Sequence, residues 1–277
     1  MILSEAASPC LSVVIPAYNE EATLETVVSE VLKLPQVVEV IVVDDGSVDK
    51  TPQVCERLSR QPKVRCVRMP NNRGKCEALK TGFALTSGEI VIVQDADLEY
   101  SPGEIPSVIQ PILDGHADVV YGSRFLVRKA ARVLYFYHYV ANKNLTLFSN
   151  LLTNVNFTDV ETGYKAFRGN IIRSMTITSK GFGIEIEITA KVAKLGCAIY
   201  EVPISYYGRT YEQGKKIGMW DGLMAFWYII KFNLFCSLKS SFTQLPSRTA
   251  PKVLVDTVAK PQLSASVSPD AVPASKA

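Results

Sequence analysis

Short apolar runs alternate with segments of helical periodicity over residues 11–122. Runs rich in β-branched residues are typical of strands buried on both faces of a sheet, and they occupy residues 11–16, 38–43, 64–68, 89–94 and 117–122. Between them, apolar residues recur at helical spacing over residues 20–34, 51–60, 74–86 and 105–114. This alternation predicts an α/β fold with a Rossmann-like, mostly parallel sheet and helices on both faces.

Polar side chains follow three of the predicted strands at the point where each strand ends. Tyr18-Asn19-Glu20 follows the first strand, Asp44-Asp45 the second, and Asp95-Ala96-Asp97 the strand at 89–94. Ligands of such sheets bind outside the carboxyl ends of the strands, which meet at one edge. We therefore expect a single ligand site that draws on all three strand ends.

The pair Asp95 and Asp97 indicates the chemistry of this site. Two carboxylates at the end of a buried strand need a compensating charge, and a divalent cation bound to a diphosphate would provide it. Hard oxygen ligands suit Mg²⁺ or Mn²⁺, and Mg²⁺ is often held by one or two carboxylates plus substrate phosphates. The alternative is a solvated turn, because Asp is also a common turn former.

Composition narrows the class of protein. The chain has 277 residues, 47% of them hydrophobic, which is ample for a packed core. Its net charge of +3 is too balanced to indicate a nucleic-acid partner. Six cysteines without a Cys-x-x-Cys pair are typical of core thiols in a reducing compartment. No signal peptide is visible in residues 1–11, so we expect a cytoplasmic protein.

The second half of the chain contains two apolar segments that allow two interpretations each. Residues 126–156 start with basic side chains and continue with aromatic and aliphatic ones. This pattern fits either an ordinary amphipathic helix or an apolar surface for a lipid-linked phosphate. Residues 222–236 form a run shorter than the ~20 apolar residues of a membrane span. It predicts a helix that packs on the core or lies in a membrane interface. Residues 244–277 are rich in Pro, Ser, Ala and Val and predict a disordered tail.

Two common nucleotide-binding classes lack their motifs here. A dinucleotide-binding oxidoreductase would carry Gly-x-Gly-x-x-Gly after the first strand, where this chain has Pro16-Ala17-Tyr18-Asn19-Glu20. The segment Asn72-Arg73-Gly74-Lys75-Cys76 is not a P-loop either. Phosphates would therefore be bound by a metal ion and isolated basic side chains.

Four motifs in order resemble family 2 glycosyltransferases with the GT-A fold. They lie at residues 14–21, 42–51, 72–75 and 95–97, and the resemblance covers residues 11–125. Further stretches resemble the polyprenyl-phosphate group of this family, of which dolichyl-phosphate mannosyltransferase is typical. These stretches lie at residues 95–102, 122–125, 158–168, 182–187, 201–204 and 209–216.

The resemblance implies one GT-A domain over residues 11–243, after an extension at 1–10. It implies a nucleotide-sugar half at 11–125 and an acceptor half with amphipathic helices at 126–243. In the family's motifs, cysteine rather than the frequent glycine follows Lys75, and the basic loop after Arg209 is longer than expected.

The resemblance also assigns roles to individual residues. Donor binding falls to Pro16, Ala17, Tyr18, Glu20, Asp45, Lys75, Asp95, Ala96 and Asp97, with Asp45 near the base. Metal binding falls to Asp95, Asp97 and Glu99. Acceptor binding falls to Arg124, Arg132 and Lys215, although a solvated helix face is an equal alternative for Arg132 and Lys143. The catalytic set is Asp97, Arg124, Arg209 and Glu161.

The need for a general base depends on the acceptor. A lipid phosphate is already ionised at neutral pH and needs only positioning and metal assistance. A sugar hydroxyl needs a carboxylate base, for which Asp159, Glu161, Glu185 and Glu187 are the candidates. Glu185 and Glu187 share a face only if they lie on a strand, and we interpret Glu187 as part of a solvated helix face.

The leading hypothesis is a metal-dependent, inverting hexosyltransferase. It would move a hexose from a GDP-mannose or UDP-glucose type donor to a polyprenyl phosphate, at the cytosolic face of a membrane with peripheral contact. Inversion is implied by the family alone. Alternatives are transfer to a saccharide hydroxyl and a non-catalytic nucleotide-sugar-binding protein. A nucleotidyltransferase would usually carry a Gly- and Arg-rich loop after the first strand, which residues 16–21 do not provide.

Overall fold

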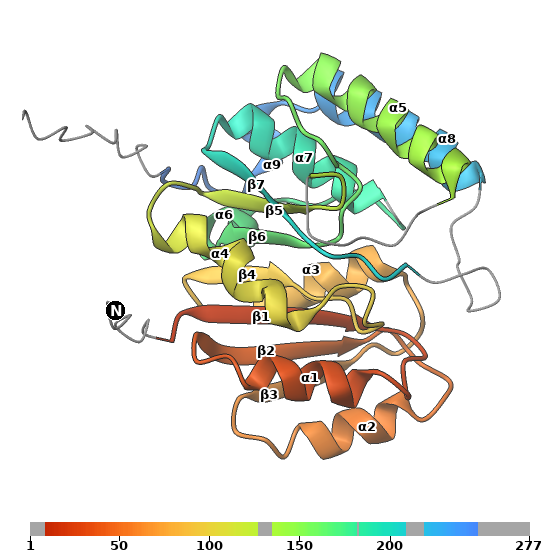
Figure 1. Ribbon diagram of the computed structural model, residues 1–277, viewed down its shortest axis with the longest axis vertical. Helices are drawn as coiled ribbons and strands as arrows, with labels where there is room; N and C mark the ends of the chain where they lie inside the picture. Colours follow the sequence, from red (N-terminus) through yellow and green to blue (C-terminus); the bar gives the residue numbers. More distant parts are fainter. Residues whose placement is uncertain (1–8, 127–134, 182, 209–218, 249–277) are drawn as a thin grey trace, which may run out of the picture.

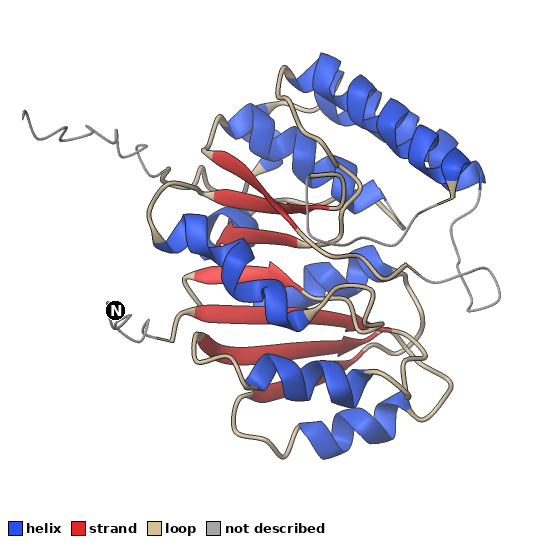
Figure 2. Ribbon diagram, in the orientation of Figure 1, coloured by secondary structure: helices blue, strands red, loops and turns tan. Residues whose placement is uncertain are grey.

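The structure, a computed structural model, describes residues 9–126, 135–181, 183–208 and 219–248 (Figure 1). These residues form a seven-stranded sheet in the order β3-β2-β1-β4-β6-β5-β7, with helices packed against it (Figure 2). The strands are β1 (Leu11–Ala17), β2 (Val37–Asp44), β3 (Val64–Arg68), β4 (Ile90–Val93), β5 (Val119–Ser123), β6 (Lys165–Arg168) and β7 (Ile199–Pro203). The five strands predicted from the apolar runs all form.

All strand pairs are parallel except those of β6, which runs antiparallel to both β4 and β5. The prediction of a mostly parallel sheet is confirmed. The carboxyl ends of β1, β2, β4, β5 and β7 therefore meet at one edge, and β6 begins there. Because β6 lies between two strands of the first half, the two predicted halves of the chain share one sheet.

Helices cover both faces of the sheet. They are α1 (Leu24–Leu32), α2 (Thr51–Leu58), α3 (Lys75–Leu85), α4 (Ile105–Leu113), α5 (Phe136–Thr153), α6 (Gly169–Ser174), α7 (Gly183–Leu195), α8 (Met219–Leu234) and α9 (Leu238–Ser241), with a 3₁₀ turn η1 (Pro102–Glu104). Side chains alternate along a strand, so Val13 of β1 packs with α1, α2 and α4, while Val14 packs with α3 and α7.

Helices α5 and α8 lie side by side on the outer side of α7 (Figure 1). The rings of Phe148 and Phe226 join them, with centroids 5.6 Å apart. None of the described helices is both long and apolar enough to cross a bilayer.

The described part of the predicted tail is attached to the domain. The Asn170 side chain donates a hydrogen bond to the Ser247 carbonyl (3.0 Å), and Arg248 donates to the Leu195 carbonyl (2.9 Å). Residues 1–8 and 249–277 lie outside the described residues. All six cysteines are free thiols.

Candidate active site

Hydrogen bonds join the loops that follow β1 and β2. Asn19 has a left-handed backbone (φ +56°), and its side-chain oxygen accepts from the amide of Val48 at 3.0 Å. Its own amide donates to the Ser47 hydroxyl at 3.0 Å, and the Glu20 amide donates to the Thr51 hydroxyl at 2.9 Å. The structure thus brings together the first two sequence motifs and places Tyr18 and Glu20 at the strand ends.

Asp45 attaches the third motif to the same edge. Its carboxylate accepts from the amides of Arg73 (2.9 Å) and Gly74 (2.7 Å), and its own amide donates to the carbonyl of Ala17 (2.8 Å). Both carboxylate oxygens of this buried residue therefore orient the loop that leads into α3. Its contact with a nucleobase stays a prediction, as do those of Pro16 and Ala17.

Lys75 and Asp95 form an ion pair at the centre of the site. The Lys75 ammonium lies 2.7 Å from Asp95 Oδ1 and 3.0 Å from Oδ2. Burial acts to lower the pKa of Lys75, but the Asp95 carboxylate outweighs it and holds that pKa above its usual value. The lysine of the third motif is therefore charged and lies beside the Asp-x-Asp motif.

Gly163 packs against this pair from the loop before β6. A Cβ atom at Gly163 would lie 3.0 Å from Asp95 Oδ2 and 3.1 Å from Lys75 Nζ. The Gly163 amide donates to the Tyr100 hydroxyl at 3.2 Å, and the Tyr100 ring stacks on Tyr164 with centroids 5.2 Å apart. A side chain at position 163 would therefore crowd the ion pair and require it to shift by a few tenths of an ångström.

Cys76 stands where glycine is frequent in the family. Its side chain is fully buried, and its thiol donates to the carbonyl of Ser179 at 3.0 Å. The cysteine therefore joins the start of α3 to the segment before α7. It does not displace Lys75 from the site.

The predicted metal ligands do not form a three-carboxylate set. Asp95 is paired with Lys75, and Glu99 accepts a hydrogen bond from the Tyr206 hydroxyl at 2.8 Å. Asp97 accepts from the Glu99 amide at 3.1 Å. Within the described ranges no group of three or more His, Cys, Asp or Glu side chains could hold a metal ion by itself. These oxygen atoms fit a cation that arrives with phosphate oxygens as further ligands, as is usual for Mg²⁺.

Arg124, at the end of β5, forms a bidentate ion pair with Asp159. Its Nε lies 2.7 Å from Asp159 Oδ2 and its second nitrogen 2.8 Å from Oδ1, and the Tyr206 ring lies against the guanidinium at 5.1 Å. Burial alone would raise the pKa of Asp159, but Arg124 holds it below its usual range. Asp159 is therefore a poor general base. Its contacts indicate instead that it orients Arg124.

Glu161 is the candidate base with the best-suited environment. Its Oε1 atom is buried and accepts no hydrogen bond. Burial raises the pKa of Glu161 to about 7, and the charge of Glu185 adds to this, whereas Lys165 and Arg124 act in the opposite direction. A carboxyl group that titrates near neutral pH is suited to general acid–base chemistry.

Glu185 and Glu187 both lie on α7 and are both buried. The solvated face predicted for Glu187 is wrong, because its carboxylate is fully buried, pairs with Lys191 at 2.5 Å and accepts from the amide of Ser179 at 2.7 Å. Glu185 pairs with Lys165 instead. The spacing of Glu187 and Lys191, four residues apart, was the available signal for the first pair.

The start of α5 contacts the residues around Arg124. Lys143 donates to the Thr158 carbonyl at 3.3 Å, and its ammonium lies 4.4 Å from the centre of the Phe125 ring. Phe125 also meets the edge of Tyr139, with ring centroids 5.4 Å apart. The solvated alternative for Lys143 therefore does not hold.

A sequence profile described as glycosyl transferase family 2 matches residues 12–174. The chain belongs to this family. It is 31% identical over 214 residues to the dolichol-phosphate mannosyltransferase of Pyrococcus furiosus. This alignment covers 75% of this chain but only 59% of that protein. It is 29% identical to the polyprenol monophosphomannose synthase of Mycolicibacterium smegmatis, over 74% of this chain and 80% of that protein. The predicted family is confirmed.

Solved structures of glycosyltransferases share the fold of this chain. The glucosyl-3-phosphoglycerate synthase of Mycobacterium tuberculosis, crystallised with Mn²⁺, UDP and phosphoglyceric acid, aligns with a TM-score of 0.64 and 25% identity. The alignment covers 82% of this chain and 80% of that one. The same synthase was also crystallised with Mg²⁺ and UDP. The predicted GT-A fold and the assignment to the glycosyltransferases are confirmed.

Three of the predicted site residues of this family 2 chain lie outside the described residues. They are Arg132, Arg209 and Lys215. Their assignments stay predictions. Ala96 is buried between the two acids of its motif, so its side chain is part of the core.

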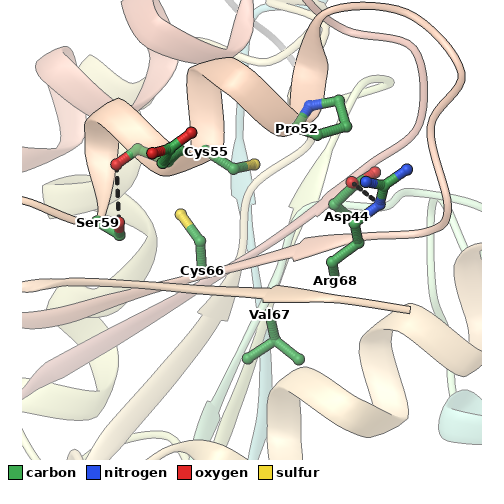
Figure 3. A pocket seen from close by; sticks show the side chains of 8 residues that line it. Asp44, Pro52, Cys55, Ser59, Cys66, Val67 and Arg68 are labelled. Carbon is green, nitrogen blue, oxygen red and sulfur yellow. Dashed lines mark hydrogen bonds and ion pairs between the residues drawn. The ribbon is translucent and has the colours of Figure 1, made fainter. Parts of the chain in front are cut away.

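A cavity of about 200 Å³ lies between α2 and β3 (Figure 3). Cys55 and Cys66 project into it, and Arg68 lies 3.4 Å from Asp44 at its far side. Its lining includes neither the Lys75–Asp95 pair nor Arg124. The cavity is therefore separate from the ion pairs of Lys75 with Asp95 and of Arg124 with Asp159.

Proposed function

We propose that the chain is a metal-dependent, inverting glycosyltransferase that transfers a hexose from a nucleotide sugar to a polyprenyl phosphate at the cytosolic face of a membrane. The relatives named as mannosyltransferases of dolichol, polyprenol and undecaprenyl phosphates support this acceptor and favour mannose over glucose. The synthase crystallised with Mn²⁺ and UDP-glucose supports the metal and the donor class.

The observation that carries the proposal is an exposed apolar surface on α5 and α8, next to the ion pair of Arg124 and Asp159. On α5, Leu147 and Leu151 are 59% and 70% exposed, and on α8 Leu223 and Trp227 are 57% and 51% exposed. Each pair is four residues apart, so each forms a stripe on one helix face. The same α5 contacts Phe125, next to Arg124, through Tyr139. A lipid chain on this surface would bring its phosphate to the charged end of the site.

The residues of the site would divide the chemistry between donor and acceptor. Asp95 and Asp97 would hold Mg²⁺ or Mn²⁺ on the donor diphosphate, where the bound cation supplies charge neutralisation of the leaving group. Lys75 adds a positive charge beside Asp95. Arg124, held by Asp159, would orient a phosphate oxygen. A phosphate acceptor is already ionised, so orientation suffices and no base is required.

Glu161 supports a second candidate, transfer to a saccharide hydroxyl. Such an acceptor must lose a proton as it attacks. The buried Oε1 of Glu161, with a pKa near 7, would accept that proton at neutral pH.

Release of nucleoside diphosphate by the purified protein tests both candidates. The assay uses GDP-mannose and UDP-glucose, Mn²⁺ or Mg²⁺, and either a polyprenyl phosphate or a simple sugar. Asp97→Ala should abolish the release, whereas Asp114→Ala, at an exposed carboxylate on the end of α4, should not. Release that depends on the lipid supports the proposal. Release only with the sugar favours the hydroxyl acceptor, and nucleotide binding without release would indicate a non-catalytic protein.

A further inference from the structure

Lys165 is a buried lysine whose ammonium is fully committed to hydrogen bonds. Only 1% of the residue is exposed. The ammonium donates to the backbone carbonyls of Val160 (3.2 Å) and Thr162, and to the carboxylate of Glu185. An ammonium group has three N–H donors, so all three are used. Lys165 therefore has no donor left for a substrate.

The two carbonyls belong to the residues on either side of Glu161. Lys165 is the first residue of β6, the strand inserted between β4 and β5, and the face of the Tyr121 ring lies 4.7 Å from its ammonium. Glu185 approaches from the first turn of α7. One buried ion pair thus joins the sheet, a helix and the loop that carries Glu161.

Charged groups from four directions surround Glu161. Arg124 lies at the end of β5 and Asp159 on the same loop, while Lys165 begins β6 and Glu185 lies on α7. Each cation is paired with one of these anions, so both ion pairs act on the Glu161 carboxyl electrostatically. Burial and Glu185 raise the pKa of Glu161, so the ionisation of Glu161 reports on Glu185.

We propose that Lys165, held by Glu185, is a positioning residue for the transfer reaction: it fixes the backbone on both sides of Glu161 and so holds this carboxyl group in the site. This inference rests on the second function proposed above, in which Glu161 accepts the proton of a saccharide hydroxyl. It assigns a role to two residues that contact no substrate. Burying a lysine and a glutamate is costly unless each is paired, and here the pairing also ties two carbonyls of the loop to β6 and α7.

Helix α7 offers a matched control in its second buried ion pair. Lys191 pairs with Glu187 and donates to the carbonyl of Thr176, and both residues are as buried as Lys165. This pair also holds backbone, but on the segment before α7. It contacts neither Glu161 nor Arg124 through any described hydrogen bond.

The test compares Lys165→Met and Glu185→Gln with Lys191→Met and Glu187→Gln. With a sugar acceptor, we expect Lys165→Met to lower kcat by about 10- to 100-fold with little change in the donor KM, because a small misplacement of the Glu161 carboxyl group is enough. Glu185→Gln should move the pH transition that Glu161→Gln removes to lower pH, by about half a unit or more. The two control variants should lower the urea midpoint and leave the pH transition of Glu161 unchanged.

A measurement without turnover separates this inference from the proposed function. The carboxyl ¹³C resonance of Glu161, assigned with Glu161→Gln, should titrate at lower pH in Glu185→Gln than in the wild type. If this shift occurs but no donor is turned over, the positioning stands and the proposed function fails. Wild-type kcat in Lys165→Met, an unshifted titration in Glu185→Gln, or equal effects of the Lys191 variant would overturn the inference.

Discussion

Replacing Gly163 by alanine tests whether the Lys75–Asp95 pair must lie where the structure places it. The new methyl group would lie 3.0 Å from Asp95 Oδ2 and 3.1 Å from Lys75 Nζ, well inside the ~3.5–4.0 Å of ordinary contact. Gly163 does not have a left-handed backbone, so the effect comes from space alone. Either the pair or the loop must move by a few tenths of an ångström.

This displacement should affect both stability and catalysis. Overpacking of this kind costs about 1–3 kcal/mol of unfolding free energy. A misplacement of 1 Å costs about 100-fold in rate, so for a shift of a few tenths of an ångström we expect kcat/KM to fall by up to about 10-fold, or about 1.4 kcal/mol of transition-state stabilisation. Affinity for a nucleoside diphosphate with Mn²⁺ should fall as well, since Asp95 is a proposed ligand.

For Gly163→Ala, calorimetric titration measures the affinity for nucleotide with Mn²⁺, initial rates measure kcat/KM, and a urea unfolding curve measures stability. Gly103→Ala is the matched control, because its methyl group would meet only the Ser101 hydroxyl, at 3.5 Å. If Gly163→Ala binds Mn²⁺ and nucleotide like the wild type and transfers at the same rate, the Lys75–Asp95 pair is not part of the donor site.

Three further predictions concern charge and surface. Asp159→Asn leaves the buried Arg124 without its partner and should cost about 3–5 kcal/mol in urea unfolding; a cost below about 1 kcal/mol would contradict the pairing. The folded-state pKa of Glu161 is raised to about 7, so its contribution to stability is present below its unfolded pKa and is lost as the pH rises toward 7. Glu161→Gln should therefore be more stable than the wild type above pH 7, by about 1–3 kcal/mol. Urea titrations at several pH values measure this difference, and equal stability would argue against burial of the Glu161 carboxyl group. Leu223→Glu on α8 should reduce cosedimentation with lipid vesicles at least about tenfold, whereas Tyr200→Glu on β7 should not, and equal binding of both would remove α8 from the membrane surface.

The sequence pattern predicted the part of the fold that local periodicity controls. Buried strands such as residues 38–43 have β-branched runs that no helix explains, and the polar strand ends located the site. Strand β6 escaped prediction because it has only four residues and contains Lys165 and Arg168, which give it no apolar run. Its antiparallel direction is decided by its neighbours in the sheet, which lie far away in the sequence.

The ion pairs of the site were harder to predict than the residues that form them. Arg124 and Asp159 are 35 residues apart, and their pairing depends on a loop whose path only the tertiary structure fixes. The same applies to Lys165 and Glu185, which are 20 residues apart. Family resemblance named Lys75 and Asp95 as neighbours of the donor, but it did not show that they bind each other.

The reversed strand β6 also acts as a spacer. It lies between β4, which leads to Asp95, and β5, which leads to Arg124. Neighbouring strands are about 4.8 Å apart, so one intervening strand keeps these two strand ends roughly 10 Å apart. A diphosphate held near Asp95 and a phosphate held near Arg124 would then lie on opposite sides of the transferred sugar, and the Asp95 and Arg124 side chains would span part of this distance. The backbone of the sheet would thus set the spacing of the two anchor points, from which the side chains reach toward leaving group and acceptor.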